Sequence, residues 1–445
     1  MTKTSNIKNR LIKGIGANAY GQAITVLTQL VSVPLFIQHW GISIYGEWLI
    51  LSALPAYLSM SDFGLGAVAG NSMVMKIAQN DKAGALVIYR SVSSFNAGMS
   101  LLILLLSTVF LSMPNMAKAL GVYQLTSMEI KLVLLLLVLQ ILVSLQTSIL
   151  SAAYRSLGRY AEGTALINTS RLIEWIMGMA MLLGGSHVIG VAAGMLAGRL
   201  LGYGITYVRL QRLEPEFYFS VNKGSSQVIK ELLAPGLAFL AFPLGLALGL
   251  QGMTLVIGSV LGAVAVAQFS VLRTLSRVLV QLVNVLNQAT WPEISKSYAE
   301  EDYSLANKLH LNSFRYALVL GVTTIFILSI LDNRLLSYWL GKNIIIDFNV
   351  FNYIMFASFI SILGQASWVV LMATNCHKRF ALVFLTSSIM SILVAFYSMP
   401  YIGLLGAALS VILSESINIL FSIKSANALL KTRNIDFIYN VLRIR

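Results

Sequence analysis

Two arginines lie one helical turn apart inside a long apolar stretch in the second half of the chain. Arg273 and Arg277 begin a polar series that continues at helical spacing. At about 100° per residue, the whole series covers roughly 80° of one helix face. An arginine at the centre of a membrane costs about 2.5–3.5 kcal/mol on insertion scales, so it requires an acidic partner, water or a bound anion. The series consists of Arg273, Arg277, Gln281, Asn284 and Gln288.

The planar fork of arginine suits phosphate oxygens, so this stripe is a candidate anion site, in particular for a diphosphate. The alternative is a structural ion pair between this stripe and Glu415 or Glu174. Arg199 stands alone in another apolar stretch and needs a partner from a second helix or from a substrate.

Acidic residues in apolar stretches are the candidates for counter-charges or for ion coupling. Arg171 and Glu174 are spaced i, i+3 and could pair within one helix, which would lower the cost of insertion. Glu415 could be a counter-charge or a proton-coupling carboxylate. Asp62 precedes a glycine-rich turn, where a helix-end role competes with coupling. Glu47, near a span end, is expected to reach the lipid headgroups.

A second polar stripe follows the first apolar stretch. Its members again fall within about 80° of one helix face. Because an unpaired polar group facing lipid costs free energy, this stripe should face protein or a water-filled cavity. It consists of Asn18, Gln22, Thr25, Gln29 and Ser32.

The elements that carry these residues are predicted to be membrane-spanning helices. The 445-residue chain is 57% hydrophobic and 11% charged, against about 25% charged in soluble domains. Its apolar runs are too long for the strands of a membrane barrel. We therefore expect an all-α polytopic membrane protein with about twelve spans, near residues 14–38, 45–65, 91–113, 130–152, 165–184, 188–208, 234–258, 266–288, 313–331, 351–373, 381–399 and 404–423.

The basic residues indicate how these spans are oriented. Of the 31 lysines and arginines, 23 lie in the two tails and one alternate set of loops, and 4 lie in the other set. The positive-inside rule then places both termini in the cytoplasm. Since the charge is confined to short loops between spans, nucleic acid is not an expected partner. Trp40 and Trp48, at span ends, are expected to be interfacial anchors.

Several kinds of chemistry find no support in the sequence. Cys376 is the only cysteine, so a disulfide framework and a cysteine metal site are excluded. The four histidines show no metal-ligand spacing, and no nucleotide-binding loop or nucleophile–base pair is legible. We predict no catalytic residues, no metal and no enzyme activity, and a first span that is retained.

A faint internal repeat suggests two halves. An offset of 221 residues aligns Gly41 with Gly262 and Trp48 with Phe269. A parallel repeat of six spans predicts two lobes related by an axis along the membrane normal. The expected division is an N-terminal lobe at 1–208, a cytoplasmic inter-lobe loop at 209–233, a C-terminal lobe at 234–423 and a basic cytoplasmic tail at 424–445.

Three short motifs carry a resemblance to a known family. They are Asn18-Ala19-Tyr20, the pattern Gly41-x3-Tyr45-Gly46-x-Trp48, and Ser61-Asp62-Phe63-Gly64-Leu65-Gly66. With twelve spans in two lobes and a proline after the eighth span (Trp291-Pro292-Glu293), the chain resembles the O-antigen (Wzx-type) and related polysaccharide flippases. These belong to the multidrug/oligosaccharidyl-lipid/polysaccharide (MOP) exporter superfamily.

The resemblance implies a two-lobe (MATE-like) bundle in a bacterial inner membrane, with a cation-lined central cavity open alternately to each side. The implied passenger is an undecaprenyl-diphosphate-linked glycan, moved from the cytoplasmic to the periplasmic leaflet. Membrane lipid, a glycan polymerase and a chain-length regulator are the implied partners. Arg273 and Arg277 occupy the span where such flippases often carry cavity cations. No cofactor is implied, and coupling to H+ or Na+ stays open.

Two alternatives remain at this point. An ion-coupled multidrug exporter of the same superfamily would need a net acidic cavity for cationic drugs, whereas here four arginines within spans face two mid-span acids, Glu174 and Glu415. A membrane glycan polymerase or ligase would need a sizeable outer surface, and the predicted outer loops are short.

Overall fold

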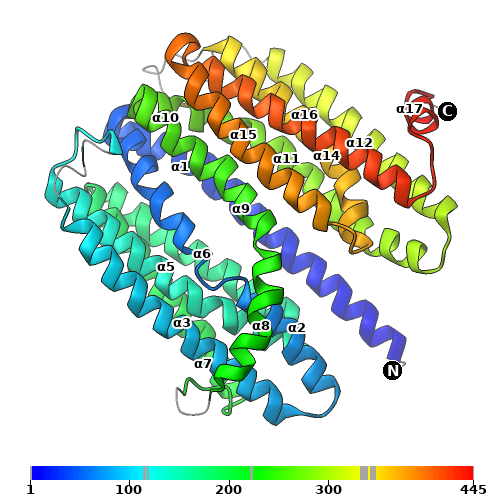
Figure 1. The fold of residues 1–445 in the computed structure, drawn as a ribbon. Helices are drawn as coiled ribbons and strands as arrows, with labels where there is room; N and C mark the ends of the chain where they lie inside the picture. The colour runs from blue at the N-terminus through cyan, green and yellow to red at the C-terminus, as the bar shows by residue number, and fades with distance from the viewer. Residues whose placement is uncertain are drawn as a thin grey trace. The chain divides into compact units, whose positions relative to one another are not determined.

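The regular structure described for this chain consists of α-helices and one π-helical turn (Figure 1). The computed structural model describes residues 3–113, 117, 120–220, 224–330, 339–340 and 347–443, and within these ranges every regular element is helical. Ten of the described helices are long and apolar enough to cross a membrane. The prediction of an all-α polytopic membrane protein is therefore confirmed. The sidedness of the termini stays a prediction.

The helices divide into two compact units, Met1–Pro243 and Leu244–Arg445. The first unit holds α1 (Lys3–Leu58), α2 (Leu65–Ala78), α3 (Lys82–Leu111), α5 (Ser127–Ser156), α6 (Tyr160–Leu183), α7 (Val188–Leu213) and α8 (Ser226–Phe239). After α9 (Ala241–Ala247), the second unit holds a π-helical turn (Leu248–Gly252), α10 (Met253–Leu261), α11 (Ala263–Ala299), α12 (Tyr303–Ile330), α14 (Phe348–Ala373), α15 (Lys378–Ile402), α16 (Leu404–Leu429) and α17 (Asn434–Leu442).

The helices extend well beyond the apolar stretches. The segment 66–90, expected to be a loop, instead contains α2 and the start of α3, and the expected loop 289–315 is largely covered by α11 and α12. Hydropathy detects only the part of a helix that is buried in lipid, whereas the backbone hydrogen bonds continue through the polar residues that follow. The expected outer loops near 114–129 and 332–350 lie partly outside the described residues.

Two glycines break helices at the positions that the repeat aligns. Gly41, inside α1, has φ 77° and ψ 168°. Gly262, between α10 and α11, has φ 86° and ψ 177°. Side chains with a Cβ rarely adopt this conformation. Gly41 thus divides α1 into the first two expected spans, and Gly262 separates α10 from α11 in the same way.

The motif that follows Gly41 is used for packing. Phe36, Trp40, Tyr45 and Trp48 form one buried aromatic cluster, with ring centroids 4.8–5.9 Å apart. The expectation that Trp40 and Trp48 anchor at the lipid interface is therefore wrong. Their rings pack against each other and against Phe36 and Tyr45 inside the protein, so they are not available to contact lipid headgroups.

Glu47 is also buried, with 1% of the residue exposed. Its carboxylate accepts hydrogen bonds from the backbone N–H groups of Tyr123 and Gln124 at 2.6 Å and of Leu125 at 3.0 Å. The expectation that Glu47 reaches the headgroups is wrong, because these loop donors take up its charge inside the protein. The motif thus fastens the turn at Gly41 to the segment that leads into α5.

Ion pairs join the helix ends of the first unit. Glu162, at the start of α6, accepts from Arg209 Nε at 2.6 Å and from Arg159 Nη1 at 3.0 Å. Asp81, in the turn between α2 and α3, pairs with Lys76 at 2.9 Å, and the hydrogen bond from this lysine lowers the pKa of the carboxyl. The basic partners are exposed, so these pairs add little to stability.

Replacing Gly41 or Gly262 by alanine should lower the free energy of unfolding by about 1–3 kcal/mol, because both occupy a backbone region that disfavours a Cβ. A Cβ at either position would meet no atom within 4 Å, so the change tests backbone strain alone. Thermal unfolding of the purified protein in detergent measures the effect. Gly98→Ala, in an open helical position, is the matched control; equal stability of all three variants would contradict the prediction.

Candidate functional site

The first unit contains a buried carboxylate shared by three helices. Glu174 of α6 forms an ion pair with Arg199 of α7, with Nη2 and Oε2 2.7 Å apart. Gln140 of α5 donates a hydrogen bond to Oε1 of the same carboxylate. The side chains of Arg199 and Glu174 are only 16% and 9% exposed. Arg199, which lacked a partner in the sequence, is thus partnered by a second helix.

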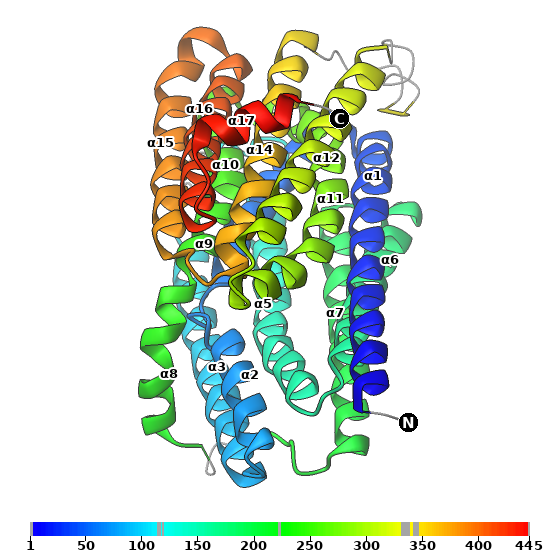
Figure 2. The ribbon, with the colours of Figure 1, turned by 90° about the vertical axis from the view of Figure 1, so that its right-hand side faces the viewer.

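Small residues allow this ion pair to form. Gly194, Gly198 and Gly202 line one face of α7 at intervals of four residues, a spacing that permits close helix packing in membranes. A Cβ at Gly198 would lie 2.5 Å from the Cα of Glu174, and one at Gly202 would lie 2.5 Å from the Cβ of Ser170. Helices α6 and α7 therefore run in close contact (Figure 2). This glycine spacing was the signal in the sequence that could have located the partner of Arg199.

Arg171 does not take part in this ion pair, because the Glu174 carboxylate pairs with Arg199. Its side chain is exposed, and it is near enough to be repelled by Arg199 and attracted by Glu174. The expected local pair with Glu174 is replaced by the interhelical pair: among the described residues no acid lies within 4.0 Å of the Arg171 guanidinium. The cluster of Arg171, Glu174 and Arg199 therefore carries a formal charge of +1.

The polar stripe of α1 faces α6 at both of its ends. Asn18 accepts from the hydroxyl of Tyr160 at 3.2 Å, and Ser32 accepts from the indole N–H of Trp175 at 2.7 Å. Asn168 of α6 donates to the carbonyl of Ala17 at 3.2 Å. The stripe thus contacts protein at these positions, as the free-energy cost of polar groups in lipid requires. Its middle members Gln22, Thr25 and Gln29 are partly buried, and the Thr25 hydroxyl donates back to the carbonyl of Gly21.

In the second unit, Arg273 is tied to the π-helical turn. Its Nη1 donates to the carbonyl of Leu250 at 2.9 Å and its Nη2 to the hydroxyl of Thr254 at 3.2 Å. A π-helical turn displaces carbonyls from the regular α-helical pattern and is often found at functional positions. Arg273 thereby connects α11 to the segment that precedes α10.

Arg277, one turn further along α11, has a different environment. Its side chain is half-buried, and in the part of the chain that the structure describes no carboxylate lies within 4.0 Å of it. The structural ion pair considered as an alternative is not formed: Glu174 pairs with Arg199, and Glu415 bonds Ser361 and Asn418. On the same helix, Gln281 is buried and Asn284 half-buried. The side chain of Gln288 lies outside the described part.

Glu415 lies in a hydroxyl-rich cluster formed by three helices of the second unit. It hydrogen-bonds Ser361 of α14 and Asn418 of α16. Ser387 of α15 donates to the side-chain oxygen of Asn418 at 2.9 Å and accepts from Ser414 at 3.2 Å. Within the described residues, Glu415 has no cationic partner within 4.0 Å. The hydrogen bonds described for this carboxylate therefore come from neutral side chains.

Asp62 has a structural position. Its carboxylate accepts from the backbone N–H of Gly64 at 3.0 Å and so stabilises the turn between α1 and α2. Gly64 has φ 71°, and a Cβ there would lie 2.7 Å from the carbonyl oxygen of Gly236 in α8. The turn thus allows two backbones to touch. Among the described residues, no group of three or more His, Cys, Asp or Glu side chains could hold a metal ion.

Solved structures with a similar fold identify the fold class of this chain. No protein-family model matches this sequence, and no curated protein matches it. An inward-facing multidrug resistance MATE transporter of the MOP superfamily superimposes with a TM-score of 0.76 at 13% identity, covering 91% of this chain and 96% of that one. The chain has the MATE fold. The MATE multidrug transporter DinF-BH gives a TM-score of 0.69 at 14% identity, with 97% of this chain and 98% of that one covered.

A lipid flippase also superimposes on the chain. The lipid II flippase MurJ, in an inward closed conformation, has a TM-score of 0.71 at 15% identity and covers 97% of this chain and 90% of its own. At such identities the similarity concerns the fold alone.

Replacing Glu174 by alanine should lower the free energy of unfolding by about 3–5 kcal/mol, because Arg199 would remain as an uncompensated buried charge. Replacing Glu174 and Arg199 together by leucine should recover most of this loss. Chemical denaturation of the purified protein gives the values. The coupling of Glu174 to Arg171, measured by a double-mutant cycle, should be smaller than its coupling to Arg199.

Glu162→Ala provides the control, since its arginine partners are half-exposed and the expected loss is only about 0–1 kcal/mol. If Glu174→Ala were no more destabilising than Glu162→Ala, the buried pair would not have the structural role described.

Proposed function

We propose that this protein is a flippase that moves an undecaprenyl-diphosphate-linked oligosaccharide, such as an O-antigen repeat unit, from the cytoplasmic to the periplasmic leaflet of a bacterial inner membrane. The observation that carries the proposal is Arg277: a guanidinium on a membrane-spanning helix without an acidic partner in the described part of the chain. Such a charge is costly in hydrocarbon and suits a doubly charged phosphate ligand.

Arg171 supports the same passenger in the first unit. Because Arg199 takes the carboxylate of Glu174, Arg171 contributes an excess positive charge on an exposed side chain. Each unit thus offers one cation on a spanning helix, Arg171 in the first and Arg277 in the second. The nearby arginines Arg199 and Arg273 are bound by protein partners. In the proposed transport cycle, Arg277 neutralises phosphate oxygens, Arg171 offers an anion-binding cation within its own unit, and amides and hydroxyls near each arginine replace water around the sugars.

We propose Glu415 as the group that couples transport to an H+ or Na+ gradient. Among the described residues Glu415 hydrogen-bonds a hydroxyl and an amide and has no ion pair, so it can bind a proton or a small cation without first breaking one. Glu174 is less suited to this role, because protonating it would break its ion pair and leave the Arg199 charge without its acidic partner. Asp62 is engaged in a turn, which favours a structural role.

A multidrug exporter is the second candidate, favoured by the similarity to the MATE multidrug transporters. A cationic drug would require a net negative binding region. The charges named above argue against it, since Arg171 and Arg277 are cations without direct acidic partners among the described residues. Glycan polymerase or ligase activity has no supporting observation.

Replacing Arg277 by alanine should reduce flipping of a lipid-linked oligosaccharide at least tenfold, since a charge-assisted hydrogen bond to phosphate contributes about 1.5–3 kcal/mol. Arg277→Lys should retain part of the activity. Accessibility of the glycan to a lectin or glycosidase added on the periplasmic side of proteoliposomes provides the measurement.

Arg209→Ala, which removes a half-exposed ion pair, is the matched arginine control and should transport normally. Full flipping by Arg277→Ala at wild-type protein levels would remove Arg277 from the proposed site. Export of cationic dyes by the wild-type protein, without any flipping, would instead support the multidrug alternative.

Replacing Glu415 by glutamine should abolish the stimulation of transport by an ion gradient while leaving downhill exchange of substrate in place. Glutamine has the same size and can still form hydrogen bonds, but it is neutral, so it neither exchanges a proton nor attracts a cation by charge. Proteoliposome transport with and without a pH or Na+ gradient tests this. Glu300→Gln, an exposed acid, serves as the control; a gradient response retained in Glu415→Gln would assign coupling to another group.

A further inference from the structure

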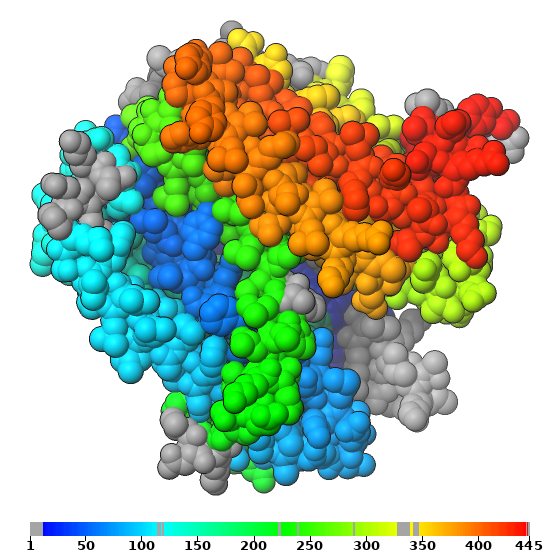
Figure 3. Space-filling view, viewed as in Figure 1, coloured from blue at the N-terminus to red at the C-terminus, as the bar shows by residue number. Residues whose placement is uncertain are grey.

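The last described helix, α17, crosses the other helices of the second unit instead of running along them (Figure 2). It begins at Asn434, shortly after α16 ends at Leu429, and it ends at Leu442. In the space-filling view it projects from the surface of this unit (Figure 3). A nine-residue helix is marginal in water on its own. Its neighbours must therefore supply the stability.

One face of α17 packs against other helices of the second unit. Phe437 and Val441 are 3% and 7% exposed and belong to the hydrophobic core between α11, α12 and α14. The ring of Phe437 stacks on His310 of α12, with centroids 4.6 Å apart and planes at 15°, and meets Phe314 edge-on at 5.3 Å. His310 is fully buried beneath it and hydrogen-bonds Ser367 at 3.0 Å.

The end of α17 is fixed by Arg315 of α12. Its Nη2 donates to the backbone carbonyls of Asn440 and Arg443, at 2.5 and 2.7 Å. Terminal carbonyls of a helix lack intrahelical partners, so a cation at this position satisfies them and interacts favourably with the helix dipole. The orientation of α17 is therefore set by the stack under Phe437 and by Arg315.

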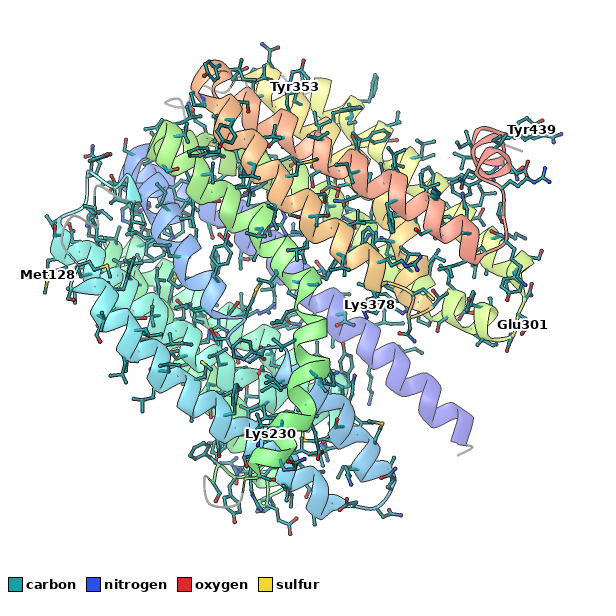
Figure 4. The ribbon with its side chains drawn as sticks, viewed as in Figure 1. Met128, Lys230, Glu301, Tyr353, Lys378 and Tyr439 are labelled. Carbon is teal, nitrogen blue, oxygen red and sulfur yellow. The ribbon has the colours of Figure 1, made fainter. Side chains whose placement is uncertain are left out.

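A second apolar face of α17 has no cover within the described structure. Ile435, Ile438 and Tyr439 are 80%, 55% and 60% exposed. Their spacing of i, i+3 and i+4 aligns them along one side of the helix. Tyr439 points away from the neighbouring helices (Figure 4). Since the seated residues Phe437 and Val441 lie on a different side, packing within the unit does not explain the exposed stripe.

Basic residues surround this stripe. Lys431 and Arg433 precede α17 and Arg443 follows it, whereas Asp436 is the one acid between them, and all four are exposed. An exposed apolar stripe bordered by cations is the pattern of a helix that lies in a membrane interface. The helix also begins next to the end of a spanning helix, α16, and therefore at the edge of the bilayer.

We propose that the stripe Ile435–Ile438–Tyr439 docks into the interface of the surrounding bilayer, and that Lys431, Arg433 and Arg443 bind anionic phospholipid headgroups. The lipid covers the face that the protein leaves exposed, while Phe437 and Arg315 hold the other side. Through this contact, anionic lipid stabilises the packing of α17 on α12 and α16. The inference does not depend on the identity of the transported substrate.

Site-specific fluorescence in nanodiscs tests the proposal with the full-length protein. In a Cys376→Ser background, Ile438→Cys and Asn440→Cys would each carry an environment-sensitive dye. Both positions are exposed, but Asn440 lies on the polar side of α17. Lipids with a spin label near the headgroup should quench the dye at position 438 several-fold more than the dye at 440, and more strongly in phosphatidylglycerol than in phosphatidylcholine.

Charge removal provides the second arm. Lys431→Gln, Arg433→Gln and Arg443→Gln should each weaken docking about fivefold at low salt, since one basic residue near an anionic surface contributes about 1 kcal/mol. The Phe437 seat is untouched by these changes, so the helix itself should persist, as amide hydrogen exchange of α17 would show.

Three outcomes would overturn the proposal. Equal quenching at positions 438 and 440 would mean that the stripe does not enter the bilayer. Equal quenching in anionic and zwitterionic nanodiscs would remove the headgroup contacts. Disulfide crosslinking of Ile438→Cys between two copies, with the dye shielded from lipid, would show that a second molecule covers the stripe.

Discussion

The rest of this structure depends on one constraint, which is that a charge on a membrane-spanning helix must be satisfied before lipid surrounds it. In the first unit Glu174 meets this constraint with Arg199 and Gln140, drawn from two other helices. Gly198 and Gly202 make the contact possible by bringing the backbones of α6 and α7 together. The ion pair and the glycine face are thus two parts of one solution, because neither long side chain could reach the other across a wider gap.

The same constraint separates structural charges from candidate functional ones. Arg273 is held by Leu250 and Thr254, and Arg199 by Glu174. Arg171 and Arg277 lack such direct acidic partners among the described residues. A cation retained at this cost requires water or an anion. Glu415 is the complementary case: its described hydrogen bonds involve neutral side chains, and among the described residues no cation lies within 4.0 Å of it.

A motif that stands out in the sequence need not mark a binding site. In the segment from Gly41 to Trp48, Gly41 breaks the helix, Trp48 joins an aromatic cluster, and the Glu47 carboxylate accepts backbone hydrogen bonds from the segment before α5. The turn at Asp62 and Gly64 likewise serves a close approach of two backbones. Such residues are constrained by packing whatever the substrate. Packing constraints of this kind are compatible with a fold shared by MATE multidrug transporters and MurJ at 13–15% identity.

The sequence by itself determined the membrane class, most of the spans and the helix break at Gly41, since hydropathy and backbone freedom are local properties. It also located the charged residues within the apolar stretches. It could not decide their partners: Arg199 was without one, Arg171 was assigned Glu174, and Glu47 was placed at the headgroups. Each of these depends on contacts between residues far apart in the chain, such as Glu47 with Tyr123. Only the tertiary structure brings those groups together, and the energy of a buried charge is set by the atoms around it rather than by its neighbours in sequence.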